Sequence, residues 1–345
     1  MSQLPTPVSL RVKPGPGRLA VTGIGNALLD VIVRDHNNLH ARLGLTKGAM
    51  NLVDLNRARE IYDGMGPTMQ VSGGSVANTI AGVASLGGTS AFLGKVGADE
   101  FGDVFAHDLR SLGVELGLAR STQSDIQTGR CHVFVTDDAQ RTMATYLGAA
   151  NQFQPDDVDT SLIERSEIVY IEGYLFDLPP AKEAIRRIVE VAHDCDTLVA
   201  LSLSDSFCVE RHHQDFLKLV SDDVDVLLSN EGEIRALFGT SSLESAFAAV
   251  DELGVLTVVT CGPAGAQVGS VSGVVSVPAA DVEVVVDQNG AGDLFAAGFL
   301  FALALGADPV EATELGSMCA GEIITHLGAR PEANLEEMAM EFGLL

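Results

Sequence analysis

The sequence contains no tryptophan, only 5% aromatic residues and few basic residues for its length of 345. Lysine and arginine number 21 against 47 aspartates and glutamates, so the formal net charge at pH 7 is −26. A chain this acidic repels a phosphate backbone, which excludes nucleic-acid binding through a general basic surface. The 46% of hydrophobic and 20% of charged residues are typical of a globular protein and not of a disordered chain.

The sequence also lacks a hydrophobic run of the roughly 18 uncharged residues that a membrane span needs. The best candidate, Leu294 to Leu305, contains Gly298 and predicts a buried helix, so we expect no membrane association. Residues 1–18 contain four of the twelve prolines and no apolar stretch typical of a secretory signal. They predict a flexible leader that is followed by one large domain over residues 19–345.

The cysteines are odd in number and never occur in a CxxC spacing, which argues against a disulfide framework and a zinc site. This pattern predicts a cytoplasmic protein. The five residues are Cys131, Cys195, Cys208, Cys261 and Cys319.

From Leu19 onward, short β-branched runs alternate with longer helical patterns. This alternation predicts an α/β fold with a central, mostly parallel sheet and helices on both faces. The N-terminal third has more adjacent strands, including a predicted hairpin of 129–136 with 142–147. We therefore expect a small β-rich lid built from segments within about 26–60 and 114–147.

The segment from Asp287 to Asp293, DQNGAGD, precedes a strongly apolar helical run. Gly290 and Gly292 leave the backbone N–H groups accessible at a helix N-terminus, where the helix dipole favours an anion. Asp293 beside such a site could accept a proton from a hydroxyl during phosphoryl transfer. Taken alone, Asp293 could also serve only to cap the helix, because an Asp in the first helical turn is a common cap.

Two further segments follow predicted strands and begin predicted helices. In GGSVAN, Gly73 and Gly74 allow a ligand to lie against the backbone, and Asn78 offers a donor and an acceptor to neighbouring hydroxyls. In NEGE, Asn230 and Glu233 suit a helix start, and they could also bind magnesium through water. Each segment is compatible with an ordinary strand-to-helix turn.

Together these motifs resemble the ribokinase-like carbohydrate kinases, also called the PfkB family. The resemblance rests on GGSVAN with the GVASLGGTSAFLGKVG that follows, on NEGE, on TCGPAG and on DQNGAGD, in that order along the chain. GNALLD and LGAANQF, together with the DxNGAGD form of the last motif, are most similar to adenosine kinases within this family. The resemblance implies a ribokinase-like fold, a kinase domain over 19–345, ATP and Mg²⁺ as cofactors, and a nucleoside or sugar as partner.

The resemblance also implies roles for individual residues. Asp293 resembles the catalytic base, and Arg141 resembles a lid arginine that reaches toward phosphate. The other matching positions are Asn289, Gly290, Ala291 and Gly292 for the anion hole; Asn26, Asp30, Gly73, Gly74 and Asn78 for the acceptor; Thr260, Gly262 and Gly265 for the nucleotide; and Asn230 and Glu233 for magnesium.

The sequence leaves the acceptor open between adenosine, another nucleoside, and a free sugar such as ribose or fructose. Tyr174 with Phe176, and Phe207, follow two predicted strands at the sheet edge where α/β proteins bind ligands. They could stack on a purine, or they could simply cap the core. Gln288, Ala77 and the SLSDSF stretch depart from the adenosine-kinase pattern. A catalytically silent binding protein, a potassium requirement, and a monomer or a homodimer also remain open.

Overall fold

The computed structural model describes residues 17–345 except Ala139 and Ser272, so the predicted leader lies almost entirely outside the described residues. Its larger sheet has nine strands in the order β14-β13-β12-β11-β10-β9-β1-β5-β6. All neighbours pair in parallel except β12–β13 and β13–β14, which are antiparallel. The strands are β1 (Leu19–Ile24), β5 (Ser90–Val96), β6 (Glu115–Arg120), β9 (Ser166–Glu172), β10 (Leu198–Ser202), β11 (Val226–Asn230), β12 (Leu256–Thr260), β13 (Ala266–Ser270) and β14 (Gly273–Val277).

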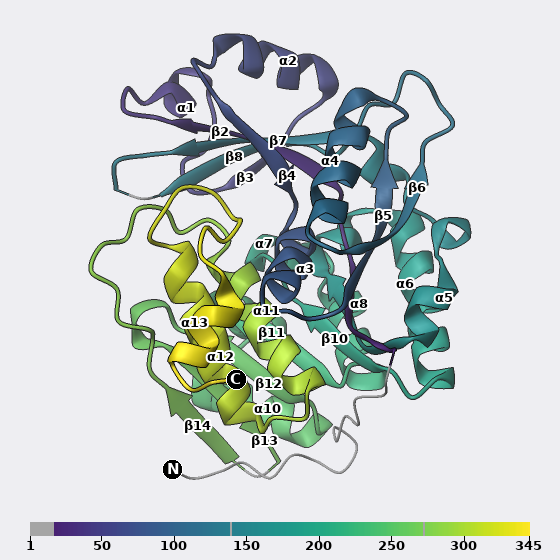
Figure 1. The fold of residues 1–345 in the computed structure, drawn as a ribbon, viewed down its shortest axis with the longest axis vertical. Coiled ribbons are helices and arrows are strands. Elements are labelled where there is room, and N and C mark those ends of the chain that lie inside the picture. Colours follow the sequence, from purple (N-terminus) through teal and green to yellow (C-terminus); the bar gives the residue numbers. More distant parts are fainter. Residues whose placement is uncertain (1–16, 139, 272) are drawn as a thin grey trace.

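Helices cover both faces of this sheet, as the sequence predicts (Figure 1). Strand side chains alternate between the two faces: in β9, Ile168 and Tyr170 pack into one core, and Val169 and Ile171 into the other. One core is covered by α3 (Ser75–Ser85), α4 (Glu100–Ser111), α11 (Ala291–Ala304), α12 (Pro309–Ile323) and α13 (Leu335–Glu341). The other is covered by α5 (Thr160–Glu164), α6 (Pro179–Asp194), α7 (Ser206–Arg211), α8 (His213–Asp222), α9 (Glu231–Phe238) and α10 (Leu243–Leu253).

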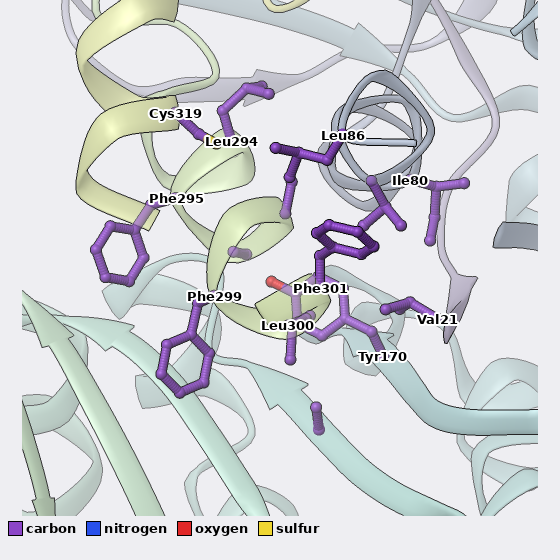
Figure 2. Packing of buried hydrophobic residues seen from close by; sticks show 14 of the residues in the cluster. Val21, Ile80, Leu86, Tyr170, Leu294, Phe295, Phe299, Leu300, Phe301 and Cys319 are labelled. Carbon is purple, nitrogen blue, oxygen red and sulfur yellow. The ribbon is translucent and has the colours of Figure 1, made fainter. Parts of the chain in front are cut away.

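Helix α11 lies at the centre of the first core, as the apolar run beginning at Leu294 predicts. Every residue from Leu294 to Ala304 is buried, because a helix that is apolar all round must be enclosed on every side. Figure 2 shows Phe295, Phe299 and Leu300 of α11 in this core together with Ile80 of α3. The core fixes the direction of α11, whose N-terminus carries the DQNGAGD motif.

The second, smaller sheet is mixed and lies beside the carboxyl ends of the large sheet (Figure 1). Helix α2 packs against β7 and β8. The predicted hairpin is present, since β7 and β8 pair antiparallel. The elements are β3 (Met50–Leu52), β8 (Arg141–Tyr146), β7 (Gly129–Val135), β2 (Leu28–Arg34) and β4 (Met69–Gly73), with α1 (Leu39–Arg42) and α2 (Leu55–Gly64).

The composition of this small sheet differs from the predicted lid segments in two strands. β6 lies within the predicted range 114–147 but belongs to the large sheet, where it pairs in parallel with β5. A strand that returns after a crossover helix such as α4 is placed beside the preceding parallel strand. β4 lies outside the predicted ranges but pairs with β2 of the small sheet.

Short 3₁₀ helices connect several strands: η2 (Gly148–Gln152), η3 (Pro155–Asp157), η4 (Gly173–Asp177) and η5 (Gly262–Ala264). Across the described part of the chain, none of the helices is long and apolar enough to cross a bilayer.

Candidate active site

Two helices begin side by side at the centre of the molecule, and Asp293 links them. Its carboxylate accepts hydrogen bonds from Ser75 Oγ at 2.7 Å and from Asn78 Nδ2 at 2.8 Å, both on α3. Thr79 Oγ1 donates to the Asp293 carbonyl at 3.0 Å. Burial raises the pKa of Asp293, and the Asn78 and Ser75 hydrogen bonds oppose this shift. The structure therefore brings the GGSVAN and DQNGAGD motifs into direct contact.

The N-terminus of α11 has the properties of an anion site. Gly290 precedes the helix with a φ of 80°, and it provides no side-chain cap for the first N–H groups. A Cβ at Gly292 would meet no atom within 4 Å, so the space before this turn is open. The Ala291 N–H donates to the Gln288 carbonyl at 3.4 Å. N–H groups without a side-chain cap at the N-terminus of a 14-residue helix favour a phosphate or another anion.

The loop before α11 is held by Asp287 and by the small sheet. The Asp287 carboxylate accepts from the Asn289 N–H at 2.9 Å and from the Gly328 N–H at 3.0 Å. Arg141 of β8 donates from a terminal guanidinium nitrogen to the Gln288 carbonyl at 2.9 Å. The predicted lid arginine therefore lies at the predicted anion hole.

Asp30 and Gly73 lie close together because β2 and β4 are paired. A Cβ on Gly73 would lie 2.2 Å from Asp30 Cγ, so only glycine leaves room for this carboxylate. Asp30 is buried, and this burial raises its pKa to about 7, while Arg330 acts in the opposite direction. The negative charge of Asp293 also raises the pKa of Asp30.

Asn26 lies where β1 ends, next to the end of β9, at the point where the strand order reverses. In open α/β sheets this point is the usual ligand crevice. Asn26 Nδ2 donates to Glu172 at 2.6 Å, and the backbone N–H groups of Asn26 and Val76 donate to the same carboxylate. Burial raises the pKa of Glu172 to about 7. Within the described residues, the buried Asn26 Oδ1 and Asn78 Oδ1 find no hydrogen-bond partner.

The predicted nucleotide and magnesium residues lie at the ends of β11 and β12 or just after them. In the sheet, β10 separates β11 from β9, and β12 lies on the far side of β11. Asn230 and Thr260 are paired in register at the ends of these strands. Gly262 and Gly265 frame a tight turn in which the Cys261 N–H donates to the Gly265 carbonyl at 2.7 Å. These residues share the carboxyl edge of the sheet with Asn26.

Glu233 forms a capping box with Asn230 at the start of α9. One carboxylate oxygen accepts from the Asn230 N–H at 3.0 Å and the other from Asn230 Nδ2 at 2.6 Å. Direct coordination of magnesium would break this box, so the donor set fits only a contact through water. Within the described residues, no group of three His, Cys, Asp or Glu side chains could hold a metal ion. The magnesium role of Glu233 therefore stays a prediction.

The capping box gives a stability prediction that does not depend on any ligand. Asn230→Ala removes the side chain that accepts from the Glu233 N–H, and we expect it to lower the free energy of unfolding by about 0.5–2 kcal/mol. Urea denaturation followed by circular dichroism measures this loss. Asn334→Ala, which removes the cap of the surface helix α13, is the matched control for the size of a cap in this chain. An unchanged unfolding midpoint for Asn230→Ala would show that the box is not formed in solution.

The aromatic residues do not behave alike. Phe207, at the start of α7, is 61% exposed and available to a ligand. The hydroxyl of Tyr174 donates to the Ser204 carbonyl at 3.2 Å. Phe176 is buried and stacks on Phe216 with ring centroids 4.1 Å apart, so it belongs to the core and not to the mouth of the sheet.

Three side chains of the site were not singled out from the sequence: Ser75, Glu172 and Arg330. Ser75 lies inside GGSVAN, and its position one residue after the glycine pair was an available signal. Glu172 follows a predicted strand, which was a weaker signal. Arg330 lies 258 residues from Ser72, to which it donates, and no local pattern connects the two.

Two hollows in the described surface lie away from Asp293. The larger, about 390 Å³, lies between α10 and the β13–β14 hairpin, and the smaller, about 290 Å³, lies between β3 and η2. Neither is lined by a predicted site residue. The candidate site is therefore defined by its converging polar groups.

Comparison with known proteins is consistent with this geometry. The model of the pfkB family carbohydrate kinases matches residues 48–336. The crystal structure of an adenosine kinase from Sinorhizobium meliloti is 40% identical, with a TM-score of 0.90 over 94% of this chain and 100% of that one. A probable sugar kinase from Rhizobium etli is 39% identical, with a TM-score of 0.91 over 95% of this chain and 99% of that one. The adenosine kinase of Saccharomyces cerevisiae is 29% identical over 88% of this chain and 94% of its own length.

Proposed function

Because this chain belongs to the pfkB family of carbohydrate kinases, we propose that it transfers the γ-phosphate of ATP to the 5′-hydroxyl of adenosine. The family and its ribokinase-like fold establish the general activity. The chain is a phosphotransferase with an alcohol group as acceptor. The observation that carries the proposal is the position of the Asp293 carboxylate in the first turn of α11, beside uncapped N–H groups.

In this proposal Asp293 accepts the proton of the attacking hydroxyl. Its hydrogen bonds from Ser75 and Asn78 fix the carboxylate in one orientation, as a general base requires. Burial raises the pKa of Asp293, which makes the carboxylate a better proton acceptor. Asp30 and Asn78 Oδ1, which has no hydrogen-bond partner within the described residues, accept hydrogen bonds from the other hydroxyls of the acceptor.

The transferring phosphoryl group is stabilised by the N-terminus of α11 and by Arg141. The N–H dipoles of the residues that follow Gly290 would stabilise the negative charge of the phosphate. The guanidinium of Arg141, which donates to the neighbouring Gln288 carbonyl, would add a positive charge there. Kinases of this family use ATP and Mg²⁺, and the bound cation neutralises charge on the phosphates. Asn230 and Glu233 would hold that cation through water, and Thr260, Gly262 and Gly265 would contact the nucleotide.

Adenosine is favoured as the acceptor by two lines of support. The relatives from Sinorhizobium meliloti and Saccharomyces cerevisiae are named adenosine kinases. Phe207 is an exposed aromatic ring at the carboxyl edge of the sheet, where a purine could stack on it.

A free sugar such as ribose or fructose is the second candidate acceptor. Phe176 is part of the core, and the Tyr174 hydroxyl is bound to the Ser204 carbonyl, so stacking on a base would depend mainly on Phe207. The unpaired oxygens of Asn26 and Asn78 suit a ligand that is rich in hydroxyls. The relative from Rhizobium etli is named a probable sugar kinase.

The deciding experiment is a panel of nucleosides and free sugars with ATP and magnesium, with ADP release as the readout. Adenosine should give the highest kcat/KM. A higher value for ribose or fructose would replace the nucleoside proposal with the sugar-kinase alternative. Replacing potassium by choline in the same assay tests for a monovalent-cation requirement.

Phe207→Ala separates the two acceptors. Loss of base stacking should raise the Kd for adenosine by roughly tenfold, because stacking contributes about 1–3 kcal/mol per base. Isothermal titration should detect this change, while the affinity for ATP stays the same. Phe342→Ala removes a similarly exposed ring, 68% accessible, near the C-terminus and is the matched control. Equal adenosine affinity in both variants would remove Phe207 from the acceptor site.

A further inference from the structure

Arg330 lies in the segment between α12 and α13 and ties this segment to the turn that begins α3. Its Nε donates to the Ser72 carbonyl at 3.1 Å, and its two terminal nitrogens donate to the Ala77 carbonyl at 2.6 Å and to Ser72 Oγ at 3.1 Å. The three acceptors lie on either side of the Gly73–Gly74 pair. A planar guanidinium that binds both ends of a turn restricts it more strongly than a single ammonium group could.

Ser72 is also held from the opposite side by α4. The Asp108 carboxylate accepts from the Ser72 N–H at 3.2 Å, and Ser72 is almost fully buried. The N–H, the carbonyl and the hydroxyl of Ser72 therefore all have charged partners. The glycine pair that follows starts from a fixed point and leads directly to Ser75 and Asn78, the partners of Asp293.

Arg330 is also the main positive charge facing Asp30. The groups that face Asp30 are Arg330 from the segment after α12, Asp293 from α11, Asp287 from the loop before it, Arg141 from β8 and Cys131 from β7. Arg330 has the largest charge effect on Asp30, and it favours the anion. Burial lowers the pKa of Arg330 to about 10, so the guanidinium is still protonated at neutral pH.

We propose that Arg330 is a positioning residue for the acceptor: its three hydrogen bonds fix the Ser72–Ala77 turn, which carries Ser75 and leads to Asn78. This inference rests on the proposed kinase function and adds a residue that acts from outside the recognised motifs. Arg330 touches the turn and not the reacting atoms. Its removal should therefore affect acceptor binding and the pH profile more than the nucleotide.

The test compares Arg330→Met, which removes the charge, with Arg330→Lys, which keeps the charge but not the fork. Arg330→Met should raise the acceptor KM about tenfold or more, because hydrogen bonds from a charged group are worth about 1.5–3 kcal/mol. The KM for ATP should change less than the acceptor KM. The acidic limb of kcat/KM for the acceptor should move to higher pH, because the positive charge of Arg330 lowers the pKa of Asp30.

Arg330→Lys should raise the acceptor KM while leaving the acidic limb in place. Arg165→Met is the matched control, because Arg165 forms an exposed pair with Glu115 at the opposite edge of the sheet. Acceptor binding without ATP, measured by isothermal titration, should fall in parallel with the change in KM. A thermal melt of each variant separates loss of folding from loss of positioning.

An active Arg330→Met whose acceptor KM and acidic limb match those of the wild type would overturn the inference and leave the kinase proposal standing. If Arg330→Met does not fold, the lysine variant decides: an unchanged acceptor KM overturns the inference, and a raised KM with an unshifted limb supports it. A wild-type protein that releases no ADP with any nucleoside or sugar contradicts both the inference and the proposed function.

Discussion

Replacing Asp293 by asparagine should lower kcat by a factor of about 10² to 10⁴, the usual contribution of a general base. The amide keeps the size of the carboxylate but cannot accept the hydroxyl proton. Its contacts to Ser75 and Asn78 rearrange only locally. Steady-state ADP release with saturating acceptor measures the loss, and acceptor affinity should change much less than turnover.

The control for this variant is Asp251→Asn, which changes an exposed aspartate on α10. Both variants lose one negative charge, so their net charges match. Asp251→Asn should retain full turnover. An Asp293→Asn protein that keeps more than a tenth of wild-type turnover would remove Asp293 from the role of base.

Replacing Gly74 by alanine should disrupt both stability and acceptor binding. Gly74 has a φ of 98°, which strains any residue with a Cβ, and that Cβ would lie 2.2 Å from the Asn26 carbonyl oxygen. The strain and the overpacking together should lower the free energy of unfolding by about 2–5 kcal/mol. Chemical denaturation measures this loss, and titration with the acceptor shows whether binding is lost too.

Gly66→Ala is the matched control for this substitution. A Cβ at Gly66 would meet no atom within 4 Å, and its φ is not in the left-handed region. Its unfolding midpoint should stay close to that of the wild type. If Gly74→Ala unfolds at the same denaturant concentration as Gly66→Ala, the close approach of Gly74 to the Asn26 carbonyl at the start of α3 does not constrain this position in solution.

Local patterns predicted most of the regular structure correctly. The apolar spacing of the sequence predicts helices over 231–238 and 243–253, and α9 and α10 span the same residues. The acidic residues after Asn230 and the left-handed glycines Gly239 and Gly254 explain why the helix ends are predictable. Helix caps are formed by residues next to the helix in the sequence. The assignment of β6 to the large sheet could not be predicted in this way, since strand partners are chosen by long-range packing.

The recognised motifs predicted the separate parts of the site, but not how the parts are held. DQNGAGD and GGSVAN each indicate a helix start from their glycines alone. The contact of Asp293 with Ser75, 218 residues away, depends on α3 and α11 packing against each other in the core. For Phe176 the sequence left two possibilities open, stacking on a purine or capping the core. Its burial and its stacking on Phe216 place it in the core.

The sequence by itself determined the α/β class, the buried helix around Asp293 and the glycine-flanked start of that helix, because these follow from periodicity and from glycine positions along one stretch of chain. Only the tertiary structure decided which side chains share the site. Glu172 meets Asn26 because β9 and β1 are neighbours in the large sheet. Arg330 meets Ser72 because the segment between α12 and α13 packs against β4 of the small sheet. Burial raises the pKa values of Asp30 in the small sheet and of Glu172 in the large sheet to about 7, since desolvation depends on everything packed around a carboxylate and not on its neighbours in the sequence.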